Sequence, residues 1–421
     1  EATQTIVKIN GSEADLMDLD GDTESEKIIE ELEPESCPNE EEYKIDSLFY
    51  RICWFCFILG VNFYQQRKLH QKIISIFIVF TNVAINVYFI IRVSLITYQK
   101  PFNPDTLATS LAMVTWTLQA TLSTLFLAYW QYTSEACKTL KQIYNSHKGV
   151  GIHHHRKCLI SIVRSFYVVI GFIIIYNVTQ MIANFRGNCV GFMDKDIPFI
   201  FGPDRRFFLI FQLANLYCML CWAVALFVFS LLVHSTNYEF HYYNQQVRSI
   251  TCDHQERTDD ALCSYLLKLM KIHHRMTECV NRLDQMFHKY AFIMIVTIIP
   301  TTTCALFMLI RRSESDFVWN LLCAFPLVIF CLFSFYALTN SPSQLHETIY
   351  ATKSALCANT HIWFPYRPNV YHSALAFVCH LDQTNLGVSI WGFAIVSKPL
   401  VLTTLSVMVT CLAMFMQFGD C

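Results

Sequence analysis

Seven long apolar runs, separated by polar segments, divide the chain. They span residues 73–96, 107–130, 159–185, 207–234, 290–310, 317–338 and 386–418. Each run is long enough to cross a hydrocarbon core of about 30 Å, which takes about 20 helical residues. The pattern predicts an all-α polytopic membrane protein with seven transmembrane helices, four of them within 73–234, two within 290–340 and the last within 387–421.

An eighth apolar stretch, residues 48–64, precedes these runs. It is only 17 residues long and contains Arg51. A short apolar segment that carries a charge is typical of a helix that lies in the membrane interface or re-enters beside the bundle. Residues 47–72 are therefore expected to form an interfacial or re-entrant segment.

Composition supports the membrane class, because 54% of the residues are hydrophobic and only 15% are charged, which is more apolar than a typical soluble domain. The acidic residues are distributed unevenly. Residues 1–46 hold 16 of the 33 acidic side chains and only three lysines. A segment of this composition cannot bury a core, so residues 1–46 are expected to form a disordered acidic tail.

Basic residues indicate how the helices run through the membrane. If the N-terminus is cytoplasmic, the inner segments hold seventeen lysines and arginines and the outer segments hold seven. The loop at residues 131–158 alone holds five of the inner ones. Because cytoplasmic loops carry an excess of basic residues, the count predicts a cytoplasmic N-terminus and an extracellular C-terminus.

The polar segment between the fourth and fifth runs has apolar residues at spacings of three, four and seven. They are Leu262, Leu266, Leu269, Met276, Val280, Leu283 and Phe287. This periodicity indicates an amphipathic helix that continues directly into the fifth run. Its apolar stripe needs partners, which the extensions of the fourth and sixth runs supply. We therefore expect a cytoplasmic helical bundle, here called the anchor bundle, from residues 235–289 and 341–386.

The last apolar run carries polar residues on one helical face. Thr410, Met414 and Gln417 are spaced at i, i+4 and i+7, so they share one side of a helix. A polar stripe in a membrane helix needs a water-filled or protein-lined environment. The stripe predicts a helix that faces a bundle interior or a water-filled path. The alternative is an amphipathic tip anchored in the membrane interface.

Polar and aromatic residues are also expected in the outer half of the helix bundle. Seven of them are candidates for binding a ligand: Asn86, Trp116, Gln119, Asn177, Gln212, Tyr217 and Trp319. Such groups among apolar neighbours suit a pocket for a small molecule, although each alone is more often an interhelical hydrogen-bonding or packing residue. The sequence contains no nucleophile elbow, HExxH motif or phosphate loop, so no enzyme activity, metal, cofactor or nucleic-acid partner is predicted.

The end of the chain resembles a known family. Thr410, Cys411, five apolar residues and Gln417-Phe418 are similar to the T-Y-five-apolar-Q-F signature that ends the last helix of invertebrate gustatory receptors of insects and nematodes. Cys411 stands where the family usually has tyrosine. The resemblance extends through residues 387–409 and, in the predicted anchor bundle, through residues 266–287.

The resemblance implies a chemosensory receptor in the plasma membrane. Such a receptor is a ligand-gated, poorly selective channel for monovalent and divalent cations, made of four identical or related subunits around one pore. On this resemblance Gln417 and Phe418 form the outer gate, and Thr410 and Met414 line the pore below it. A small-molecule tastant is expected to bind within each subunit.

Two alternatives remain open at this stage. A nematode branch of the same family senses light or peroxide, and a metabotropic receptor also has seven helices but runs through the membrane in the opposite direction. The sequence does not identify the stimulus among sugars, bitter compounds, carbon dioxide, oxidants and light.

Overall fold

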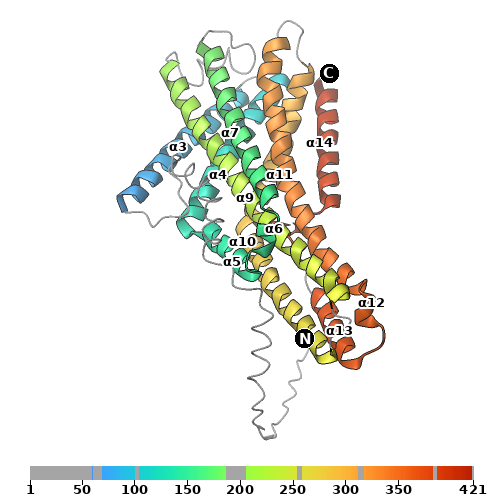
Figure 1. Ribbon diagram of the computed structural model, residues 1–421. Helices are drawn as coiled ribbons and strands as arrows, with labels where there is room; N and C mark the ends of the chain where they lie inside the picture. Colours follow the sequence, from blue (N-terminus) through green and yellow to red (C-terminus); the bar gives the residue numbers. More distant parts are fainter. Residues whose placement is uncertain are drawn as a thin grey trace, which may run out of the picture. The chain divides into compact units, whose positions relative to one another are not determined.

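The computed structural model describes residues 59, 69–99, 104–185, 205–253, 258–311, 317–382 and 386–419, so the predicted acidic tail, residues 1–46, and most of the 47–72 segment lie outside the described residues. The described part is almost entirely helical (Figure 1). Its elements are α3 (Leu69–Gln99), α4 (Pro104–Thr133), α5 (Glu135–Ser146), α6 (Val150–His154), α7 (Arg156–Phe185), α9 (Arg205–Asp253), α10 (Asp259–Arg311), α11 (Phe317–Cys357), α12 (Thr360–Trp363), α13 (Pro368–Asp382), β1 (Ser389–Ile390), β2 (Ala394–Ile395) and α14 (Lys398–Gly419).

Seven helices of the described residues are long and apolar enough to cross a membrane. They are α3, α4, α7, α9, α10, α11 and α14. Each contains one of the apolar runs of the sequence, in the same order along the chain. The predicted all-α fold with seven membrane helices is therefore confirmed.

Three of the spanning helices continue far beyond their apolar parts. α9, α10 and α11 have 49, 53 and 41 residues, and Figure 1 shows their extensions gathered with α12 and α13. At 1.5 Å per residue, α9 is about 74 Å long, which is more than twice the thickness of a hydrocarbon core. α9 therefore runs as one continuous helix from the membrane part into the anchor bundle.

The apolar stripe of α10 is buried in the anchor bundle, at Leu262, Leu266, Leu269, Met276, Val280, Leu283 and Phe287. Its neighbours are α9 and α13. His273 of α10 lies between Phe240 of α9 and Phe377 of α13, with ring centroids 6.0 and 6.1 Å away. The Tyr243 hydroxyl of α9 donates to the carbonyl of Leu269, 2.9 Å away. These contacts give the stripe its partners.

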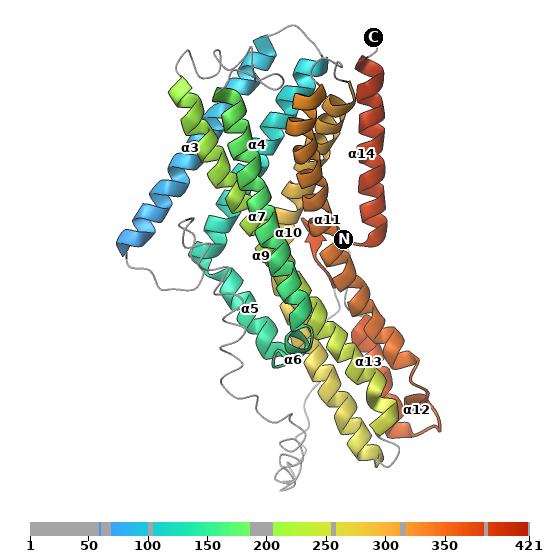
Figure 2. The same cartoon turned by 45° about the horizontal axis from the view of Figure 1, so that its top comes forward.

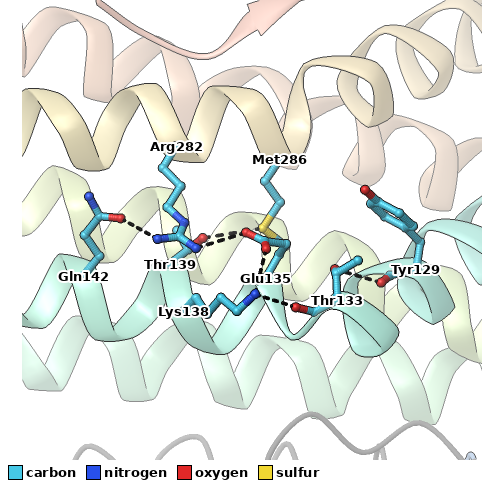
Figure 3. A network of polar contacts seen from close by, with 8 residues as sticks. All are labelled: Tyr129, Thr133, Glu135, Lys138, Thr139, Gln142, Arg282 and Met286. Carbon is cyan, nitrogen blue, oxygen red and sulfur yellow. Dashed lines mark hydrogen bonds and ion pairs between the residues drawn. The ribbon is translucent and has the colours of Figure 1, made fainter.

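The segment at residues 131–158, expected to be a loop, forms the helices α5 and α6 instead. Figure 3 shows the polar contacts between α5 and α10. Arg282 of α10 forms an ion pair with Glu135, 3.2 Å away, and donates to Gln142 Oε1 at 3.0 Å. Ala136, Thr139 and Ile143 are buried, so α5 is an amphipathic helix. Its buried stripe is short and alternates with lysines, so hydropathy did not identify the helix.

The last helix begins later than expected. The apolar run starts at Leu386, but α14 starts at Lys398, and a β1–β2 hairpin precedes it. Gly387 and Gly392 have φ angles of 153° and 77°, which glycine adopts readily and most other residues do not. Pro399 then occupies the first turn of α14, where its missing N–H costs no hydrogen bond. Hydrophobicity alone did not distinguish this hairpin from a helix.

Candidate pore helix and ligand site

α14 stands at one edge of the spanning helices in both views (Figures 1 and 2). One of its faces packs against the rest of the chain. Met408 is buried, and Leu412, Phe415 and Met416 contact a buried apolar cluster that includes Phe307. The rings of Phe307 and Phe415 lie 5.8 Å apart. This face holds α14 against α10.

The opposite face of α14 is exposed and carries the polar stripe. Its residues are Thr403, Ser406, Thr410, Met414 and Gln417, all exposed. The hydroxyls of Thr403 and Thr410 donate to the carbonyls of Pro399 and Ser406, 3.0 and 2.9 Å away, so they are satisfied within the helix itself. Thr410, Met414 and Gln417 thus share a face, and the described part of the chain leaves that face uncovered. The side chain of Phe418 lies outside the described residues.

The hairpin before α14 is bound to α10. The backbone N–H of Ser389 donates to Asp284 Oδ1 at 2.6 Å, and that of Trp391 donates to the carbonyl of His288 at 3.2 Å. The Trp391 ring contacts the edge of Phe292, with centroids 5.0 Å apart. The start of α14 is therefore fixed to the segment of α10 that leads into its membrane-spanning part.

Two of the predicted ligand residues lie at the contact between α3 and α9. Asn86 is fully buried, and its Nδ2 donates to Sγ of Cys218 at 3.1 Å. Tyr217, the neighbour of Cys218, donates its hydroxyl to the carbonyl of Leu59 at 3.2 Å. Leu59 is buried, which brings one residue of the 47–72 segment into contact with the helices.

Trp116 belongs to an aromatic cluster of three rings from α4, α9 and α11. It packs edge-on against Trp222 and Phe330, with centroid distances of 5.1 and 5.4 Å, and these two rings lie 4.7 Å apart. Trp222 is fully buried, and its Nε1 donor has no hydrogen-bond partner among the described residues. The cluster therefore offers an apolar wall with one unused donor.

Gln119 lies one turn further along α4 and is also fully buried. Neither its Oε1 nor its Nε2 has a hydrogen-bond partner within the described part of the chain. Its neighbours on this face of α4, Thr115 and Ser123, are paired with Thr301 and Met294 of α10 at 2.7 and 3.4 Å. A buried amide without partners is costly, so Gln119 provides a donor and an acceptor for a ligand or a bound water.

The remaining candidates do not join these groups through any hydrogen bond or ring contact between described side chains. Asn177 of α7 is buried and donates to the carbonyl of Ile173 in its own helix at 2.9 Å. Gln212 of α9 is half-buried, and the side chain of Trp319 lies outside the described residues. The sequence interpretation missed Trp222 and Cys218, although the spacing of Cys218, Cys221 and Trp222 along the fourth run marks one helical face.

Comparisons with known proteins agree with this architecture. The sequence profile of the family described as 7tm chemosensory receptor matches residues 49–420. The fold is similar to that of the insect olfactory receptor OR5 from Machilis hrabei, with a TM-score of 0.68, 11% sequence identity, and coverage of 89% of this chain and 99% of that chain.

A second structure of that receptor, in complex with eugenol, has a TM-score of 0.66 and 11% identity, and the match covers 88% of this chain and 99% of that one. The search of curated protein sequences found no match. The family profile matches nearly the whole chain, and the described residues contain seven spanning helices. The chain therefore belongs to the seven-transmembrane chemosensory receptors, a family of multi-pass membrane receptors rather than enzymes.

Proposed function

We propose that four copies of this chain, or this chain with related subunits, form a ligand-gated, poorly selective cation channel in the plasma membrane. The N-terminus is cytoplasmic and α14 lines the pore. The observation that carries the proposal is the exposed stripe of Thr403, Ser406, Thr410, Met414 and Gln417 on a membrane helix that is packed on its other side.

Polar side chains on a membrane-spanning helix are unfavourable in contact with lipid. Around a fourfold axis, four copies of the stripe would face one another and line a water-filled path. None of the five stripe residues is charged, which supports weak ion selectivity. Rings of Met414 or Phe418 side chains would close the path by dewetting.

The C-terminal signature supports a taste receptor within the chemosensory family. The ligand site that fits best lies at the aromatic cluster of Trp116, Trp222 and Phe330, next to the unpaired amide of Gln119. Apolar walls with few hydrogen-bonding groups suit a small uncharged molecule that carries an oxygen acceptor. Asn86, Asn177, Gln212, Tyr217 and Trp319 remain candidates for further contacts.

Cysteine accessibility tests the pore assignment. In the full chain expressed in cells, Thr410→Cys places a thiol on the stripe, and Val409→Cys places one on the exposed apolar flank of the same turn. A charged, water-soluble thiosulfonate reagent applied with agonist should block current through Thr410→Cys channels and leave wild-type and Val409→Cys channels unchanged. Equal modification of both variants, or of neither, would contradict the assignment.

A further inference from the structure

An ion pair joins α11 to α13 in the anchor bundle. Lys353 Nζ lies 2.6 Å from Asp382 Oδ1, and both side chains are about half exposed. The hydrogen bond with the Asp382 carboxylate raises the pKa of Lys353, so this amine is charged throughout the physiological range. The pair shows which levels of the two helices lie side by side.

A second contact indicates that the chain runs backward along α11 after Asp382, as expected if α11 and α13 are antiparallel. A Cβ atom on Gly387, five residues after Asp382, would lie 3.5 Å from Cδ2 of His346, seven residues before Lys353. Moving forward from the end of α13 therefore corresponds to moving backward along α11. Figures 1 and 2 show α13 beside the extension of α11.

This register brings two cysteines to the same level, on the side of the ion pair away from His346 and Gly387. Cys357 lies four residues after Lys353, and Cys379 lies three residues before Asp382, so each is one turn away. Both are free and exposed, and both lie close enough to Lys353 to interact with its charge. On this register the two accessible thiols are expected to face each other across α11 and α13, one turn from the ion pair.

The thiolate is the reactive form of cysteine, and both side chains are exposed to a small disulfide in solution. A thiolate here attacks one sulfur of a small disulfide, forms a mixed disulfide and releases one small thiolate. The thiolate of the opposite cysteine then attacks the protein sulfur of that mixed disulfide and releases the second. The protein pair loses two electrons, and the small disulfide is reduced to two thiols.

We propose that Cys357 and Cys379 form a reversible thiol–disulfide switch, set by small disulfides of the glutathione type, that locks α13 to α11. α13 leads through the hairpin into α14, and α11 carries Glu347, which pairs with Lys398 at the start of α14. The disulfide would therefore restrain the elements that hold α14 and lower the agonist-evoked current. The thiol chemistry does not depend on the channel function, whereas the effect on current rests on it.

Mass spectrometry of the purified full chain in nanodiscs tests the chemistry. After oxidised glutathione and a thiol block, a peptide linking Cys357 to Cys379 is expected, and dithiothreitol should abolish it. Cys357→Ser should leave Cys379 as the glutathione mixed disulfide. Cys158→Ser is the matched control, because Cys158 is exposed at the start of α7. Glutathionylation of Cys158 in wild type without any Cys357–Cys379 peptide would overturn the proposal.

Inside-out patches test the regulation. Oxidised glutathione on the cytoplasmic face should reduce the current of wild type and Cys158→Ser, and dithiothreitol should restore it, whereas Cys357→Ser and Cys379→Ser should not respond. Disulfide formation with unchanged current would overturn the regulatory step. A chain that gives no current with any ligand overturns the channel proposal and this step with it, while the linked peptide still decides the thiol chemistry.

Discussion

Lys398, the first residue of α14, forms an ion pair with Glu347 of α11, with Nζ and Oε1 2.6 Å apart. The side chains of Lys398 and Glu347 are 66% and 49% exposed, so the pair contributes little to folding, about 0–1 kcal/mol. Its position matters more than its energy, because it links the start of α14 to the helix that also carries Lys353.

Breaking this pair should therefore change the agonist response more than the stability. Glu347→Gln is expected to alter the agonist concentration for half-maximal current while the unfolding temperature stays within about 2 °C of wild type, since an exposed pair is weak. The exchange Glu347→Lys with Lys398→Glu should restore the response. A single and a double variant that both respond like wild type would exclude a role in gating.

Truncation of the proposed gate should make the channel leak. In the proposed tetramer, Phe418→Ala removes an aromatic side chain from each subunit at one constriction, which should hydrate the constriction and raise the resting conductance. Gln417→Ala should change conductance in the same region. Val409→Ala is the control on the exposed apolar flank of α14. Wild-type resting current in both gate variants, at normal surface expression, would refute the assignment.

Replacing Gln119 should separate stability from ligand response. Gln119→Leu removes two buried groups that lack hydrogen-bond partners in the described residues, so stability should rise by about 1–3 kcal/mol while the agonist response falls. Thr115→Val is the matched contrast: its hydroxyl is paired with Thr301, so stability should fall by about 1 kcal/mol. Thermal unfolding in detergent and agonist dose–response curves measure the two effects.

The anchor bundle should lose stability in acid through His273. Burial, together with the nearby His380 and His274 rings, lowers the pKa of His273 from 6.5 to about 4. Between these values the unfolded chain binds a proton that the folded chain does not, so stability is full above pH 6.5 and falls as the pH drops toward 4. The loss approaches about 3 kcal/mol near pH 4.

Unfolding temperatures at pH 7.5 and pH 5 measure this effect. His273→Gln should reduce the difference between the two temperatures, whereas His372→Gln, which changes an exposed histidine, should not. An unchanged difference in His273→Gln would assign the acid sensitivity to other groups.

The sequence predicted the features that depend on the residue pattern within a single helix. Hydrophobic length identified the seven spanning helices of the described residues, and the 3.6-residue period placed Thr410, Met414 and Gln417 on one face. The contact of Trp116 with Trp222 was beyond reach, because it depends on how three helices pack. The hairpin before α14 was missed because it depends on backbone angles at Gly387 and Gly392, which hydropathy does not report.

The uncovered stripe of α14 has a consequence for the cell biology of the receptor. A subunit without partners exposes this stripe on a membrane-spanning helix, where lipid offers the amide of Gln417 no hydrogen-bond partner. The quality control of the secretory pathway could therefore recognise an unassembled chain by the exposed polar stripe of α14. If the proposed channel is correct, delivery to the cell surface should depend on assembly, and the stripe proposed to line the pore would also control export.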